Sequence, residues 1–283
     1  MSEDPASLRQ ERRRLERQRR IKRRRIAALG IAVVAFAVLA AAALAYRHFN
    51  EDTPPPVVLR TITLTIPEGY DRSQTAALAK QEGLRGDYMK ASVGHEGFLF
   101  PDTFELNRHA PVSDLVQLQL QDFKRRVAGV DMGYARSKNL TVRDVVTIAS
   151  MVEREAQLDS ERKLIAAVIY NRLRQGIPLG IDATVRFAVG NYERPLTASE
   201  LETDSPYNTR LYAGLPPGPI GNPGVASIEA AAHPAQVDYL YYVVKPGTCG
   251  EHSFSSTDAE FQADVARYNA ARAAAGGESP DSC

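Results

Sequence analysis

Two glutamates at the end of an apolar run have the residue type and spacing for acid–base chemistry. Glu153 and Glu155 lie in the stretch IASMVEREAQ, residues 148–157. A carboxyl group that is pressed against apolar side chains keeps its proton more readily, because its charged form loses hydration. Such a group can donate a proton to the leaving oxygen of a substrate near neutral pH. The two glutamates are therefore the first candidates for a catalytic acid.

The helix that carries them is expected to begin after Thr141, because Asp144 follows at the third position of a capping box. With steps of about 100° per residue, the apolar side chains of this helix share one stripe. Its members are Val142, Val145, Val146, Ala149, Val152 and Ala156. Glu153 lies roughly 50° from the centre of that stripe and Glu155 roughly 110° from it. Glu153 is predicted to face inward, and the alternative is a marginal glutamate that pairs with an arginine such as Arg172.

The segments around this helix predict an α+β domain. Strands are expected within residues 60–69 and 238–244, and an extended aromatic segment at 95–106 is interrupted by Pro101. Helices are expected over 73–83, 112–127, 160–176, 227–234 and 257–273. Residues 176–190 and 204–224 are rich in Gly, Pro and Asn, and they are predicted to form ordered loops. The tail, residues 274–283, is predicted to be disordered.

The N-terminal part combines a basic segment with a long apolar run. Residues 1–25 hold 11 Lys/Arg against 4 Asp/Glu, and the 20 residues of 26–45 are uncharged. Such a run is long enough to cross a bilayer as a helix, and flanking arginines hold their end in the cytoplasm. We expect a transmembrane helix at 26–45, a linker at 46–59 and an extracytoplasmic body. A cleaved signal peptide is the alternative, because ALA at 43–45 resembles a cleavage site, and a nucleic-acid-binding arm is disfavoured.

Six further motifs occur in an order that is highly specific in combination. They are EGFLFPDTF at 96–104, ASMVEREA at 149–156, VIYNRL at 168–173, IDATV at 181–185, YNTRLYAGLPPGPIGNPG at 207–224 and AAAHP at 230–234. Over roughly residues 60–270 the sequence resembles the YceG-like family of endolytic murein transglycosylases. The resemblance implies a YceG-like catalytic domain at 93–273. It also implies a LysM-like module, here shortened to residues 60–92, so that independent glycan binding by this module is in doubt.

The resemblance implies an endolytic lytic transglycosylase, anchored in the cell membrane, that cleaves the β-1,4 bond between N-acetylmuramic acid and N-acetylglucosamine. Nascent glycan strands would end in 1,6-anhydro sugars and stop growing. The family's catalytic glutamate lies in the motif matched by MVEREA, so it is carried onto Glu153, with Glu155 as the fallback. One residue would act first as acid and then as base without water, whereas ordinary glycoside hydrolysis generally uses two carboxylates.

Loop residues near these motifs are candidates for substrate binding. Asp182 could polarise Glu153, or it could cap a turn. The Asn208 amide, the hydroxyls of Tyr207 and Thr209 and the flat Tyr207 ring could bind the sugars. The rigid proline-rich segment 214–220 could line a groove. Both segments could equally be structural scaffold. The predicted set is Asp182, Tyr207, Asn208, Thr209, Gly214, Leu215 and Pro216.

No cofactor and no metal site are expected, because no His/Cys/Asp cluster has metal-ligand spacing. Cys249 and Cys283 fall in the exported part, where a disulfide is permitted but not proven by their spacing. The expected partners are peptidoglycan glycan strands and the membrane. The resemblance also points to peptidoglycan synthases, for which the sequence has no partner motif. Two rival functions remain open: a non-catalytic glycan-binding scaffold, and a hydrolase in which Asp182 or Glu155 activates water.

Overall fold

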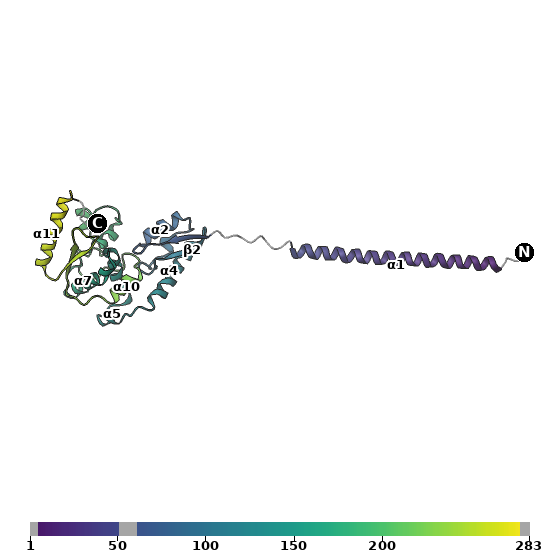
Figure 1. Cartoon of the computed structure of the whole chain (residues 1–283), viewed down its shortest axis with the longest axis horizontal. Coiled ribbons are helices and arrows are strands. Elements are labelled where there is room, and N and C mark those ends of the chain that lie inside the picture. Colours follow the sequence, from purple (N-terminus) through teal and green to yellow (C-terminus); the bar gives the residue numbers. More distant parts are fainter. Residues whose placement is uncertain (1–4, 51–60, 278–283) are drawn as a thin grey trace. The chain divides into compact units, whose positions relative to one another are not determined.

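The computed structural model describes residues 5–50 and 61–277 of the chain (Figure 1). The chain divides into two compact units, Met1–Val58 and Leu59–Cys283. Each unit is described by itself below. Cys283 and the rest of the predicted tail beyond residue 277 lie outside the described residues, as does the predicted linker from residue 51 onward.

The first unit contains a single long helix, α1, Pro5–Asn50. It covers the predicted apolar span and continues through the first residues of the predicted linker. Between Arg17 and Phe49 it holds a segment that is long and apolar enough to cross a membrane. Large apolar side chains such as Phe36 and Leu39 are exposed along it. One apolar helix is thus present as predicted, whereas its orientation and the cleaved-signal alternative remain predictions.

The second unit begins with a two-stranded antiparallel sheet packed against helices. Strand β1, Thr61–Thr65, pairs with β2, Thr103–Asn107, and Leu64 lies opposite Phe104. Between and after the strands lie α2, Arg72–Gln81, α3, Tyr88–Ala91, and α4, Val112–Val127. Buried apolar side chains of these elements, among them Leu64, Leu99 and Leu115, form one core cluster. The predicted module at 60–92 therefore shares its sheet and core with residues up to α4, and its likeness to LysM remains a prediction.

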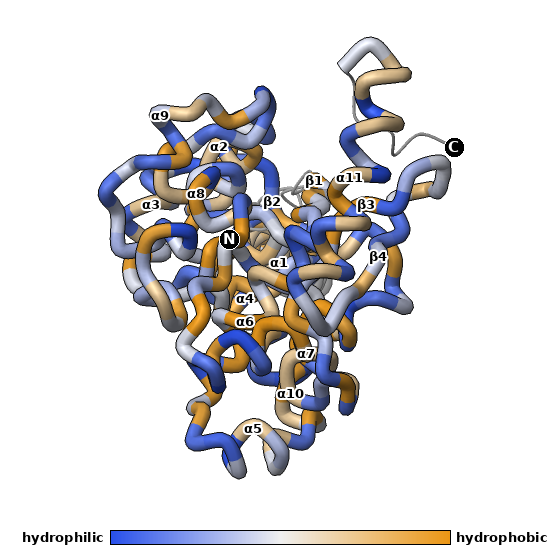
Figure 2. The backbone as a smooth tube through the Cα atoms, turned by 90° about the vertical axis from the view of Figure 1, so that its left-hand side faces the viewer, coloured by the Kyte–Doolittle hydropathy of each residue, from blue (hydrophilic) through white to orange (hydrophobic). Residues whose placement is uncertain are grey.

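The remainder of the unit is mainly helical. Its elements are α5, Gly133–Ser137; α6, Val142–Glu155; the 3-10 helix η1, Asp159–Glu161; α7, Arg162–Gln175; α8, Asp182–Val189; α9, Ala198–Leu201; α10, Val225–Ala232; β3, Tyr241–Val244; β4, His252–Ser255; and α11, Asp258–Ala274. Strands β3 and β4 pair antiparallel. Helix α6 packs against α7, α8 and α10. The tube of Figure 2 is largely in the hydrophobic colour where α6, α7 and α10 are labelled, as expected for the centre of the main core.

The local sequence signals explain where the site-bearing helices begin and end. Helix α6 starts at the predicted capping box, in which the Thr141 side chain accepts from the Asp144 N–H. Helix α7 ends at Gly176, whose φ of +68° is the left-handed conformation that glycine adopts at little cost. Residues Val145 to Val152 of α6 are all buried, so this helix is surrounded by core rather than covering one face of it.

Candidate functional site

Glu153 lies in the last turn of α6 with a side chain that is only 6% exposed. It faces inward, as the helix periodicity predicts, but its carboxylate has polar partners. The Gly224 N–H donates to Glu153 Oε2 at 3.0 Å, and Arg162 Nη2 lies 3.4 Å from Oε1. The ion-pair partner is therefore Arg162 and not the suggested Arg172, which donates instead to backbone carbonyls, including that of Leu240.

Arg162 is itself fixed at the start of α7. Its Nε donates to Ser227 Oγ at 3.0 Å, and its Nη1 pairs with Asp159. The Arg162 side chain is 12% exposed, so it presents its charge to Glu153 from a mostly buried position. A guanidinium that is held in this way sets the orientation of the carboxylate that it contacts.

A second carboxylate, Glu68, adjoins Glu153 through the backbone of Gly224. A Cβ atom at position 224 would lie 1.9 Å from Glu68 Oε1, so the Glu68 carboxylate packs directly on this glycine. Burial and then the negative charge of Glu153 raise the pKa of Glu68, whereas Arg162 lowers it. Glu68 is exposed at the residue level, whereas Glu153 is half-buried at that level and its side chain is only 6% exposed. No periodic pattern in the sequence singles out Glu68, whose only local signal is the Pro-Glu-Gly turn after β1.

That turn is positioned by contacts with a segment far along the chain. The Tyr70 N–H donates to Pro67 O, and Gly69 has a φ of +79°, which fits the third position of a type II turn. The Gly69 N–H donates to Asn222 O at 2.8 Å, and the Asn222 N–H donates to Tyr70 O at 2.9 Å. Gly221 allows this approach, since a Cβ atom there would lie 2.4 Å from Gly69 O.

The buried side chain of Asn222 completes this junction. Its Nδ2 donates to Tyr70 O at 2.8 Å and to Glu96 Oε1 at 3.2 Å, and its Oδ1 accepts from the Leu99 N–H at 2.9 Å. Burial raises the pKa of Glu96 to about 7, although the Arg72 N–H donates to its Oε2. Three segments, 67–72, 96–99 and 221–224, are thus joined beside Glu153.

Glu155, the fallback residue, lies in different surroundings. Its Oε2 accepts from Tyr242 Oη–H at 2.9 Å, and burial raises its pKa while this hydrogen bond lowers it. A cavity of about 250 Å³ is lined by Glu155 and Asp182, together with Arg154, Ala183, Arg186 and Tyr192. Asp182 is exposed and pairs with Arg210 at 2.8 Å. The structure therefore places Asp182 beside the cavity of Glu155.

The predicted loop residues 207–209 differ in their exposure. Tyr207 is partly buried, and its ring centroid lies 4.9 Å from that of Phe187. Asn208 and Thr209 are 0% and 1% exposed. Asn208 Nδ2 donates to two backbone carbonyls of residues 201 and 203, and Thr209 Oγ1 accepts from the Ile181 N–H. These two side chains hold the loop to α8 and α9, and they can reach a ligand only if the loop opens.

The proline-rich segment has one accessible end. Gly214 has a φ of +98°, and a Cβ atom there would meet nothing within 4 Å. Leu215 packs against the main core, and Pro216 is buried. Gly214 therefore has open space at its Cβ position, where a ligand could approach its backbone.

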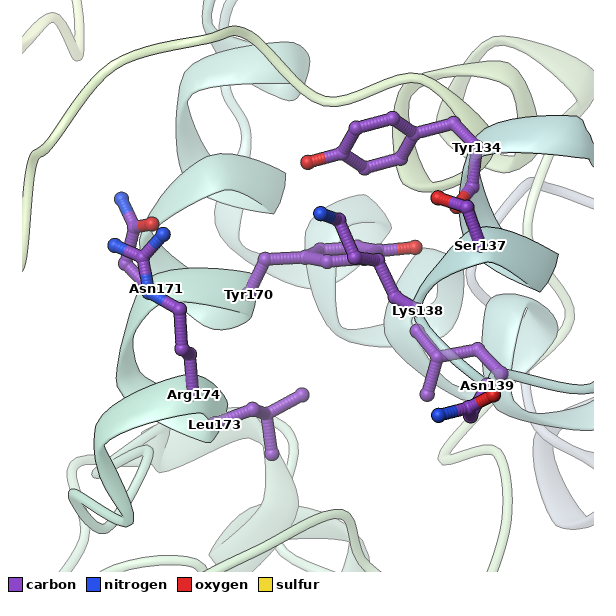
Figure 3. Close-up of a pocket in the computed structure, with 9 residues that line it drawn as sticks. Tyr134, Ser137, Lys138, Asn139, Tyr170, Asn171, Leu173 and Arg174 are labelled. Atoms are coloured by element: carbon purple, nitrogen blue, oxygen red, sulfur yellow. The ribbon is translucent and has the colours of Figure 1, made fainter.

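A further cavity of about 430 Å³ lies between α5 and the end of α7 (Figure 3). The rings of Tyr134 and Tyr170 flank it with centroids 5.8 Å apart, and Lys138 lies over the Tyr134 ring. None of the predicted site residues lines it. Within residues 5–50 and 61–277, no group of three or more His, Cys, Asp and Glu side chains could hold a metal ion.

Comparison with known proteins identifies the family. The family model described as "YceG-like family" matches residues 39–267, most of the chain. The chain belongs to the YceG-like family. A YceG-like protein from Listeria monocytogenes, solved by crystallography, superposes with a TM-score of 0.64 at 28% identity, covering 72% of this chain and 76% of that one.

Two curated relatives of this YceG-like chain are named endolytic murein transglycosylase. The Bacillus subtilis protein is 36% identical over 185 residues, which cover 64% of this chain and 51% of the relative. The Streptococcus pneumoniae protein is 29% identical over 248 residues, which cover 73% of this chain and 44% of the relative. The chain therefore spans about half the length of the curated relatives that it matches.

Proposed function

We propose that this chain is a membrane-anchored endolytic lytic transglycosylase of peptidoglycan and that Glu153 is its catalytic residue. The observation that carries the proposal is a buried carboxylate at the end of α6, held between Gly224 and Arg162 and adjoined by a second carboxylate, Glu68. The names of the curated relatives support the substrate class.

The chemistry needs one group that first gives and then takes a proton. Protonated Glu153 donates to the glycosidic oxygen between N-acetylmuramic acid and N-acetylglucosamine, and the C1–O4 bond breaks. The Glu153 carboxylate then accepts the proton of the muramic C6 hydroxyl, whose oxygen bonds to C1. The product ends in a 1,6-anhydro sugar, and Glu153 regains its starting state without a water molecule.

The other predicted residues receive different roles in this proposal. Tyr207 and the open backbone at Gly214 contact the glycan, because both are accessible at least in part. Asn208 and Thr209 act indirectly by fixing the loop that carries Tyr207. Asp182 lies at the cavity of Glu155 and binds substrate there, with Leu215 and Pro216 as the wall that supports Gly214.

The proposed location follows from α1. Its apolar segment anchors the chain in the cell membrane with the arginine-rich end in the cytoplasm. The catalytic unit then lies outside the cytoplasm, where nascent glycan strands are found. Peptidoglycan synthases are the proposed protein partners, on the ground of the family alone.

The decisive experiment uses the full chain in detergent with uncrosslinked glycan strands and product analysis by mass spectrometry. We expect shortened strands with 1,6-anhydro ends. The Glu153→Gln variant should lose activity by a factor of about 100 or more, because the amide keeps the shape but cannot transfer the proton. The exposed Glu105→Gln change on β2 is the matched control and should leave the rate unchanged.

Two outcomes of this experiment contradict the proposal. Strand binding without shortening indicates a glycan-binding scaffold. Products heavier by one water than anhydro ends indicate a hydrolase, and the shared cavity of Glu155 and Asp182 is the observation that favours this second candidate. Glu155→Gln would then remove activity while Glu153→Gln would keep it.

A further inference from the structure

We propose that Glu68 is a positioning residue whose negative charge, held across Gly224 from Glu153, favours the proton-donating form of Glu153. This inference rests on the proposed function, and it adds a residue that the motif carrying Glu153 does not contain. It assigns a role to the Pro-Glu-Gly turn after β1.

The geometry of the turn fixes Glu68 beside Glu153. Glu68 occupies the second position of the turn, whose next residue, Gly69, is bound to Asn222 by its N–H. The same glycine lies against Glu153, since a Cβ atom at position 69 would be 3.4 Å from Glu153 Cγ. On the other side, Gly224 contacts the Glu68 carboxylate and donates its N–H to Glu153. One peptide segment on each side thus touches both glutamates.

Charged groups of both signs surround Glu68. Glu153 on α6 and Asp159 on η1 are negative and raise the pKa of Glu68, whereas Arg162 on α7 lowers it. Arg154 of α6 also faces the turn, with Nε 3.5 Å from a Cβ position at Gly69. Two neighbouring carboxylates resist simultaneous ionisation, so a negative charge on one favours the protonated form of the other. Glu68 makes no hydrogen bond within the described residues, so its charge is its main contribution here.

The pair of glutamates would act in both halves of the reaction. Before bond cleavage the proton is on Glu153, and it leaves with the glycosidic oxygen. Both carboxylates are then charged, and their repulsion strengthens Glu153 as the base that takes the C6 hydroxyl proton. The proton balance of the cycle is unchanged, because Glu153 holds one proton at its start and one at its end.

The kinetic test compares pH–activity profiles of the full chain in detergent. In Glu68→Gln the alkaline limb of kcat should move to lower pH by about one unit, because the pair loses a negative charge. Activity at the acid end of the profile should be retained. Glu105→Gln removes one negative charge elsewhere and should leave the profile in place. An unchanged profile in Glu68→Gln, with active wild-type protein, would overturn the inference and leave the proposed function standing.

A second measurement does not depend on activity. The carboxyl carbon of Glu68 can be followed by NMR during a pH titration of the wild-type chain and of Glu153→Gln. The pKa of Glu68 should fall toward its ordinary value in the variant, because the charge of Glu153 is gone. Identical titrations in both proteins would refute the pair even if Glu68→Gln failed to fold. Absence of cleavage by wild-type protein, with coupled titration, would instead refute only the proposed function.

Discussion

At the scale of single residues, Glu96 connects the site to the pH dependence of stability. Its pKa is raised to about 7, chiefly because burial removes water from its charged form. The folded chain therefore binds this proton more tightly than the unfolded chain does. The resulting stabilisation is complete below the ordinary value near 4.5 and is lost as pH rises to about 7.

We expect Glu96→Gln to remove this pH dependence. The difference in free energy of unfolding between variant and wild type should change by roughly 2 kcal/mol between about pH 5 and 8, in favour of the variant at the higher pH. Urea unfolding at several pH values measures it. Parallel curves for the two proteins would show that Glu96 titrates normally in the folded chain.

At this scale the sequence predicts the inward position of the Glu153 side chain, because the helical period alone directs it toward the core around α6. The sequence does not predict the position of Glu68, because its carboxylate contacts Gly224, 156 positions along the chain, and no periodic pattern reports such a contact. Asn208 and Thr209 were selected for their polar groups, which the fold uses internally.

At the scale of elements, Asn222 joins segments 67–72 and 96–99, which adjoin β1 and β2, to the residues beside Glu153 at the end of α6. Asn222→Ala removes three side-chain hydrogen bonds and leaves the buried Leu99 N–H without its acceptor. We expect the free energy of unfolding to fall by about 3 kcal/mol. The exposed Asn107→Ala on β2 is the matched control and should change it by less than about 0.5 kcal/mol. Equal losses in both variants would mean that the junction does not hold these elements together.

Helices are predicted best from the sequence where clear capping residues mark their ends. Helix α4 has the expected bounds, and α6, α7 and α11 begin or end at the expected caps. Helix α8 was expected to be a loop, because it is eight residues long, follows a Gly-Pro-rich stretch and has no side-chain cap. Strand β4 lies in a short polar segment, and pairing with β3 rather than its own composition makes it a strand.

At the scale of the whole molecule, α1 predicts attachment to a membrane. Val34→Arg with Leu39→Arg places two charges in the apolar segment, at about 3 kcal/mol each near the centre of a membrane-spanning helix. We expect the full chain to leave the membrane fraction on centrifugation. The apolar exchange Val34→Leu with Leu39→Val is the control and should stay with the membrane. A mature chain that begins after Ala45 would contradict the anchor and indicate a cleaved signal peptide.

The junction between the Pro-Glu-Gly turn and residues 221–224 also determines the order in which the candidate site can assemble during synthesis. Ribosomes synthesise the turn early, and they add Gly224, whose N–H donates to Glu153, more than 150 positions later. Until that late segment emerges and docks, Glu153 lacks the N–H of Gly224 and Glu68 lacks its contact with the same glycine. If Glu153 is the catalytic acid that we propose, an incomplete polypeptide cannot cleave peptidoglycan while it is still being synthesised.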